Sequence, residues 1–301
     1  MEPRIYGPYP FLPISRRKRF TWPGGARLAL WVIPNLEFFH LDDVMPGANN
    51  ERIAAAHAKV PNVRNWTMRD YGNRVGFWRM LEMLNRHKIR ATAALNSDIC
   101  KHHPEMIEAA VASQWEFMGH CQTNAVRLNE MTPEDERKAI RETLERIGRA
   151  SGRKTVGWLG AGLAETWHTL EHLVEAGVEY VADWASDDLP FRMTVESGSI
   201  MSIPYTLHCN DTAQFFDQKA TAAEFGEVLR RQFAQLHKES VDIPRVMAVA
   251  LHPFISGMPY RIGAVDAALA HFRAQEGVWF ATGSEIVEHY RRMVPEADIS
   301  D

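Results

Sequence analysis

Apolar residues in this chain occur as short continuous runs that alternate with stripes at helical spacing. The run over residues 27–39 is apolar through most of its length, which is typical of a strand buried on both faces. Pro34 is expected to stop the ladder of this strand and to deliver Asn35 and Glu37 to its carboxyl end. Ligands bind at the carboxyl ends of strands in parallel α/β folds, so these two residues are the first candidates for a site.

Similar runs recur along the rest of the chain, with helical stripes between them. Further strands are expected over residues 89–95, 115–119, 155–159, 178–182, 199–203, 245–251 and 278–281. This alternation predicts one parallel sheet with right-handed crossovers. For a chain of 301 residues we expect a closed or nearly closed α/β barrel rather than an open, doubly wound sheet.

The barrel domain is expected to extend over residues 27–292. Residues 1–26 are rich in Pro, Arg and Gly and predict an extended N-terminal arm, and residues 293–301 a C-terminal tail. Residues 40–73 show little periodicity, and such a long irregular insertion usually forms a lid or a pocket wall.

Composition and charge narrow the class of protein. The net charge of -4 gives no electrostatic footprint for nucleic acid or an anionic membrane, and no apolar run is long enough for a membrane span. Three widely spaced cysteines argue for a reducing compartment and against a disulfide framework or a cysteine-based zinc site. With no signal pattern, we expect a cytoplasmic protein, in which the Asn-x-Thr sequences at Asn65 and Asn210 carry no glycan.

Four strand ends carry polar residues in one order. They are Asn35-Leu-Glu37, Gly119-His120 with Asn124, Gly157-Trp-Leu-Gly-Ala-Gly162 and Leu251-His252-Pro253. Together with the segments 71–79, 116–120, 183–190 and 278–283, this order resembles the polysaccharide deacetylase (NodB-homology, carbohydrate esterase 4-like) superfamily. The closer resemblance is to its branch of metal-independent allantoinases and cyclic-imide hydrolases. It covers residues 27–292 and implies a distorted (β/α)7 barrel.

The resemblance also shows a departure at the metal site. The usual deacetylases of the superfamily place two adjacent aspartates after the first strand, one as base and one as metal ligand, with two histidines four residues apart. Here Glu37 keeps the base position, Phe38 replaces the ligand, and His120 is followed by Asn124. A catalytic zinc needs about three protein ligands, so we expect no metal and no other cofactor. A rearranged zinc site that uses Glu37 and His120 is the alternative.

The resemblance implies a hydrolase of carbon–nitrogen bonds in a small cyclic amide, imide or ureide. Glu37 is the expected general base, with its pKa raised by a partly apolar pocket that holds Phe38 and Trp31. His252 is the expected general acid or oxyanion stabiliser. His120 is expected to donate a hydrogen bond to a substrate carbonyl, together with Asn124.

Six residues are expected to bind the substrate or line its pocket: Asn35, Asn124, Arg69, Arg74, Trp158 and Asp187. A structural role is the competing interpretation for several of them, since an arginine near Tyr71 can bridge a loop to a helix and Asp187 can cap a turn. The expected partners are a small-molecule substrate and further copies of the chain in a dimer or tetramer.

Two other functions remain open. One is a metal-dependent N-deacetylase of an N-acetylated carbohydrate, which the fold would allow but Phe38 and Asn124 disfavour. The other is a non-catalytic small-molecule binder, which the retention of Glu37 and His252 disfavours.

Overall fold

A mixed sheet forms the centre of the molecule in the computed structural model, which describes residues 6–43, 45 and 61–295. The strands in this part of the chain are β1 Leu28–Leu36, β2 Thr92–Leu95, β3 Glu116–Gly119, β4 Gly157–Trp158, β5 Tyr180–Val181, β6 Phe191–Val195, β7 Gly198–Ser202, β8 Arg245–Leu251 and β9 Val278–Phe280. Their order is β6-β7-β5-β4-β3-β2-β1-β8, and β9 pairs with the first part of β1. All pairs are parallel except β6 with β7.

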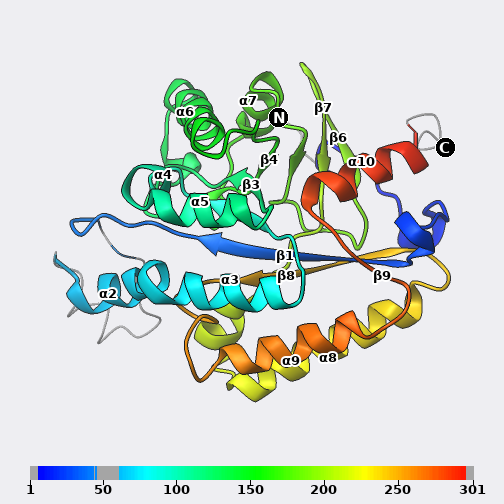
Figure 1. Ribbon diagram of the computed structural model, residues 1–301. Helices are drawn as coiled ribbons and strands as arrows, with labels where there is room; N and C mark the ends of the chain where they lie inside the picture. Colours follow the sequence, from blue (N-terminus) through cyan, green and yellow to red (C-terminus); the bar gives the residue numbers. More distant parts are fainter. Residues whose placement is uncertain (1–5, 44, 46–60, 296–301) are drawn as a thin grey trace.

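Helices cover the sheet on two sides (Figure 1). They are α2 Val63–Tyr71, α3 Phe77–Arg86, α4 Ile99–His102, α5 Pro104–Ala112, α6 Pro133–Ser151, α7 Thr169–Glu175, α8 Ala222–Glu239, α9 Ile262–Arg273 and α10 Gly283–Met293. Several begin at the residues that the sequence indicates. The Thr221 hydroxyl and the Glu224 carboxylate form a capping box that satisfies backbone donors at the start of α8.

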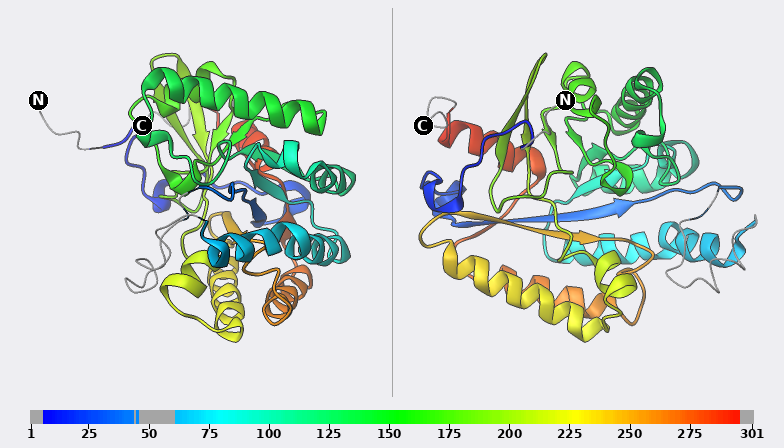
Figure 2. Two further views of the ribbon diagram at one scale, coloured as in Figure 1. Left: turned by 90° about the vertical axis from the view of Figure 1, so that its left-hand side faces the viewer. Right: turned by 180° about the vertical axis from the view of Figure 1, so that it is seen from behind.

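The sheet curls without closing, which confirms the predicted distorted barrel as an open half-barrel (Figure 2). Strands β6 and β8 are the two ends of this order, and the gap between them is covered by the chain between β5 and β6 and by the chain that follows β7. There Val246 N–H donates to the Asp188 carbonyl at 2.8 Å, and Ala250 N–H donates to the Cys209 carbonyl at 3.0 Å. We refer to this gap between the edges as the seam.

The core has three parts: an outer cluster, an inner cluster and a third cluster under α6 and α7. The outer cluster packs α3, α5, α8 and α9 against β1, β2 and β8. The inner cluster fills the curl and includes Trp31, Tyr180 and, from α10, Ile286 and Tyr290. Helix α10 therefore closes the amino end of the half-barrel, and the carboxyl ends of the strands face the opposite side (Figures 1 and 2).

Three expectations are corrected. Pro34 does not end β1: the pairing with β8 stops at Pro34↔Leu251, but the pairing with β2 continues to Leu36↔Leu95. The sheet is not wholly parallel, because Phe191–Val195 forms an antiparallel hairpin with β7. Within the segment 40–73, the structure contains helix α2, and residues 44 and 46–60 lie outside the described part of the chain.

Among the described residues, no helix combines the length and the apolar character needed to cross a bilayer.

Candidate active site

The structure brings Glu37 and His252 together at the carboxyl end of the sheet. Strands β1 and β8 are paired in parallel, so the residues that follow them emerge side by side. The Glu37 Oε1 atom lies 3.4 Å from His252 Nε2. Both side chains are more than nine-tenths buried, at 9% and 8% exposed. These are the two residues that the sequence indicated for acid and base chemistry.

Asp211 completes this cluster from the other side of the imidazole. Its Oδ1 atom lies 2.6 Å from His252 Nδ1, and its Oδ2 atom accepts the His252 backbone N–H at 2.7 Å. The Asp211 side chain is fully buried, and a backbone bridge between Asn210 and Ala250 holds its segment against β8. The imidazole is therefore bonded at both nitrogens to carboxylates, as an Asp211–His252–Glu37 chain.

Sequence reasoning missed Asp211. The tripeptide 210–212 drew attention only as an Asn-x-Thr sequence, and the aspartate in its middle lies 41 residues before His252. Its segment belongs to no strand with a recognisable apolar run. Only the curl of the sheet places it beside β8.

The electrostatics of the cluster favour two charged partners. Burial lowers the pKa of His252, but the charge and hydrogen bond of Asp211, followed by those of Glu37, outweigh it and raise that pKa to about 10. Burial raises the pKa of Glu37, but the hydrogen bond and charge of His252, with smaller contributions from Arg69 and His120, outweigh it and lower that pKa. At neutral pH the pair is an imidazolium and a carboxylate.

This result corrects the expected tuning of Glu37 by an apolar pocket. Trp31 lies in the inner core, where its ring meets that of Tyr180. Phe38 is half-buried and stacks on the His102 ring at a centroid distance of 4.9 Å. The imidazolium of His252 sets the pKa of Glu37 instead.

His120 follows β3 and is also buried in the site. Its Nδ1 atom lies 2.6 Å from the Leu159 carbonyl oxygen, which can only accept, so Nδ1 carries the hydrogen. Burial is the main cause that lowers the pKa of His120, so the ring is neutral and Nε2 has a free lone pair. His120 therefore presents an acceptor, and the predicted donation to a substrate carbonyl is wrong for this tautomer.

Asn96, which no sequence pattern indicated, connects the strand ends. Its Oδ1 atom accepts the Phe38 backbone N–H at 2.8 Å, and its Nδ2 atom donates to the His120 carbonyl. The Asn124 backbone N–H donates to the Phe38 carbonyl at 3.0 Å, which places Asn124 beside the same loop. The loops that carry Glu37 and His120 are thus fixed to one another through the buried end of β2.

Arg69 reaches the site from α2. Its guanidinium lies over the rings of Phe39 and Phe254, at 4.9 and 5.1 Å from their centroids. These rings come two residues after Glu37 and two residues after His252. Helix α2 lies beyond the carboxyl ends of β1 and β8 (Figure 1). The Arg69 cation is close enough to Glu37 to help lower the pKa of that carboxyl.

The residues present do not fit the metal site of the usual deacetylases. Phe38 offers no lone pair where the second aspartate would be, and its ring is engaged with His102. No group of three His, Cys, Asp or Glu side chains in the described ranges has the arrangement of a metal site.

Three predicted binding residues are engaged elsewhere. Arg74 is a surface residue, with its side chain 73% exposed and its guanidinium 3.9 Å from Asp70. Trp158 is fully buried in the core under α6 and α7. Asn35 donates to the Ile33 carbonyl at 3.2 Å and accepts from the Tyr205 hydroxyl at 3.3 Å, which makes it part of the interior.

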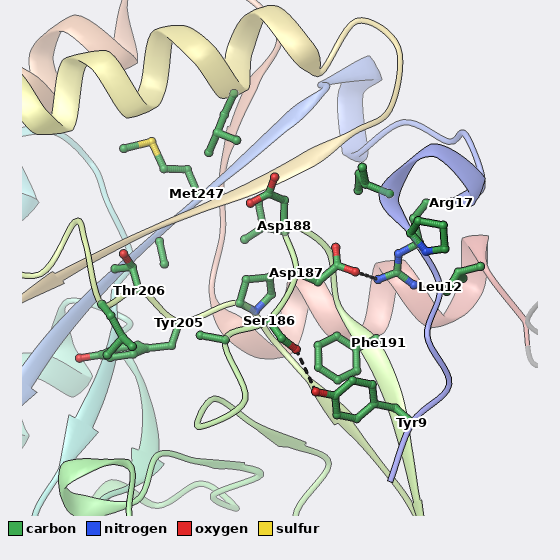
Figure 3. Close-up of a pocket in the computed structure, with 18 of the residues that line it drawn as sticks. Tyr9, Leu12, Arg17, Ser186, Asp187, Asp188, Phe191, Tyr205, Thr206 and Met247 are labelled. Carbon is green, nitrogen blue, oxygen red and sulfur yellow. Dashed lines mark hydrogen bonds and ion pairs between the residues drawn. The ribbon is translucent and has the colours of Figure 1, made fainter. Parts of the chain in front are cut away.

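The fourth, Asp187, lies at the seam. Figure 3 shows the cavity there, about 580 Å³ in volume, with Asp187 paired to Arg17 of the N-terminal arm at 3.0 Å. Arg17 also donates to the Pro190 carbonyl at 2.8 Å. Asp187 therefore anchors the arm to the barrel and is not brought into contact with Glu37 or His252.

A second pair of buried acids, Asp183 and Glu165, follows strands β5 and β4. The Gly160 N–H donates to Asp183 at 2.8 Å, and the Trp184 indole donates to Glu165 at 3.0 Å. Burial, then the neighbouring charge of Asp183, raises the pKa of Glu165 to about 9, and burial raises the pKa of Asp183 to about 7. The Glu165 carboxyl is therefore protonated at neutral pH.

Comparison with known proteins gives the family context of this geometry. The polysaccharide deacetylase family model matches residues 64–181. A Schizosaccharomyces pombe protein named "Putative polysaccharide deacetylase" is 25% identical over 91% of this chain and 93% of its own length.

Two solved structures share the fold along almost the whole chain. One is a "probable Polysaccharide deacetylase from Pseudomonas aeruginosa PAO1", with a TM-score of 0.80 and 26% identity, over 90% of this chain and 93% of its own. The other is the PuuE allantoinase, with a TM-score of 0.79 and 26% identity, over 91% of this chain and 93% of its own.

Proposed function

We propose that this chain, which is similar to polysaccharide deacetylases, is a hydrolase that cleaves a carbon–nitrogen bond in a small cyclic amide, imide or ureide. The observation that carries this proposal is the buried Asp211–His252–Glu37 chain, beside a Phe38 that cannot ligate a metal. It supplies an acid and a base in one hydrogen-bonded unit.

The proposed reaction begins with a water between Glu37 and His120. The Glu37 carboxylate takes a proton from this water, and His120 Nε2 accepts a hydrogen bond from its second hydrogen. The water oxygen bonds to the carbonyl carbon, and the carbonyl π electrons move onto its oxygen.

Collapse of this tetrahedral intermediate breaks the ring carbon–nitrogen bond. The His252 imidazolium gives its Nε2 proton to the departing nitrogen, and Asp211 stabilises the imidazolium beforehand and fixes its orientation. The protonated Glu37 then returns its proton to His252 Nε2, which lies 3.4 Å away. The cycle adds one water and leaves both residues in their starting states.

The substrate class follows from the kind of carbonyl that such a site can attack. Hydrogen bonds and nearby charge polarise a carbonyl less strongly than a directly bound metal does, so a strained or electrophilic ring is a better substrate than an unactivated acetamide. The identity to the allantoinase equals that to the Pseudomonas protein, at 26%. The choice of a ring therefore depends on the chemistry of the site.

The test is hydrolysis of a panel by chelator-treated protein, with and without added zinc. The panel contains succinimide, phthalimide, hydantoin, dihydrouracil, allantoin and a chitin oligomer. We expect ring opening of at least one cyclic substrate to survive chelation. Activity only on the chitin oligomer, or only after zinc addition, would contradict the proposal.

A further inference from the structure

The proposed reaction leaves one charge without a partner, the negative charge that develops on the carbonyl oxygen in the transition state. His252 is bonded to Asp211 and Glu37, and neutral His120 offers a lone pair. A reaction that builds an oxyanion in a buried site needs a preorganised donor or cation there.

Arg69 has the position and the free hydrogen-bonding capacity for this task. One terminal nitrogen donates to the Asn65 side chain, and the two aromatic rings of Phe39 and Phe254 hold the plane of the guanidinium. Its Nε–H is buried and has no hydrogen-bond partner among the residues that the structure describes. No carboxylate in the described part of the chain lies within 4.0 Å of it. A guanidinium that is held but not neutralised is typical of an anion or oxyanion site.

Its charge already acts on the catalytic base. Arg69 is among the groups that lower the pKa of Glu37, although no ion pair joins the two side chains. A substrate carbonyl whose carbon is attacked by a water on Glu37 therefore lies next to this cation.

We propose that Arg69 is a further catalytic residue, which donates to the scissile carbonyl oxygen and stabilises the oxyanion formed there. This inference rests on the proposed function. It gives the chain its own source of the positive charge that a metal ion would otherwise supply.

Kinetics of Arg69 variants on the ring that the protein opens provide the test. Arg69→Gln is expected to lower kcat by about 10²-fold or more with a much smaller change in KM, because the contact forms mainly in the transition state. Arg69→Lys keeps the charge but loses the forked donors, so its kcat should lie between that of the parent and that of Arg69→Gln. Arg74→Gln is the matched control, since Arg74 is a nearby surface arginine, and its kcat should match that of the parent.

Chemical rescue separates a catalytic role from a structural one. In Arg69→Ala, millimolar guanidinium should restore kcat at least about 10-fold, while Arg74→Ala shows no response. Circular dichroism and thermal unfolding of each variant show whether it is folded. If Arg69→Gln and Arg69→Ala do not fold, Arg69→Lys provides a variant whose longer side chain retains the packing.

Three outcomes would overturn the inference. A kcat in Arg69→Gln within about threefold of the parent is the first, and a folded Arg69→Ala that guanidinium does not rescue is the second. The third is a loss of kcat that is confined to acid pH. This would show that the guanidinium acts only by lowering the pKa of Glu37. A parent protein that opens no ring would overturn the proposed function itself, and with it the role of Arg69 in that reaction.

Discussion

Two buried pairs of carboxyl groups at the carboxyl end of the sheet have different neighbours, and the pKa of Glu37 in one pair shifts in the opposite direction from those in the other. Glu37 and Asp211 lie on either side of an imidazole, whereas Glu165 and Asp183 face each other with no cation in contact among the described residues. The pKa of Glu37 is lowered, and the pKa values of Glu165 and Asp183 are raised to about 9 and about 7. Burial raises the pKa of Glu37, Glu165 and Asp183 alike, so the neighbouring histidine is the main cause of the difference.

The comparison shows that desolvation alone does not leave a carboxyl group ionised in this fold. A buried acid whose pKa lies well above physiological pH, such as Glu165, is protonated there and cannot take another proton. A buried acid beside an imidazolium stays ionised, and the imidazolium is held ready as the acid.

The largest effect is expected for Glu37→Gln. Removing the general base should lower kcat on the ring substrate by about 10²- to 10⁴-fold, since a glutamine cannot accept the proton of water. Glu165→Gln is the matched control, because it replaces a carboxyl that is already protonated. Steady-state kinetics of both variants on the same ring measure the contrast. Equal losses in the two would show that the two pairs are not different in function.

Asp211→Asn is expected to have a smaller effect at neutral pH and a clear one on the pH profile. In the parent, His252 acts as an acid only while protonated, so the rate should fall as pH rises through about 10. Without the Asp211 charge the pKa of His252 falls, and the alkaline limb should move to lower pH with a loss of about 10-fold in rate at neutral pH. The measurement is kcat between pH 5 and 11. An unmoved limb would rule out Asp211 as the residue that tunes His252.

The smallest effect is expected for the thermal stability of a variant at the second pair, Glu165 and Asp183. Between the ordinary pKa of 4.5 and the raised value of about 9, the unfolded chain binds fewer protons than the folded one at Glu165, so this group makes stability fall as pH rises. Glu165→Gln removes that penalty. Its Tm relative to the parent should therefore rise between pH 5 and 9, by roughly 2–4 °C. Differential scanning calorimetry of both proteins at several pH values measures this difference in Tm. A constant difference would mean that Glu165 is ionised in the folded state.

Much of the fold was predictable because it depends on local pattern. The strand over residues 245–251 has the same bounds in the structure, and the helix that Thr221 caps begins where the capping box lies. Short apolar runs beside turn signals were harder to interpret. The strand Phe191–Val195 was missed, because a hairpin edge strand has little apolar periodicity of its own.

The candidate site was only partly predictable. Glu37, His120 and His252 each follow a predicted strand directly, so the parallel sheet brings them to one edge. Arg74 and Trp158 looked equally suitable in sequence, but a helix turn points one into solvent and the sheet buries the other. The sequence did not reveal in which direction each of these side chains points from its helix or strand.

The sequence by itself determined the alternation of strands and helices, the absence of the second metal-binding aspartate, and the strand ends that carry an acid and two histidines. These are properties of neighbouring residues, so spacing reveals them. Only the tertiary structure decided which groups carry charge. Asp211 and Arg69 come to Glu37 and His252 from segments far away in the chain, and the pKa of a buried group depends on the neighbours that folding places around it.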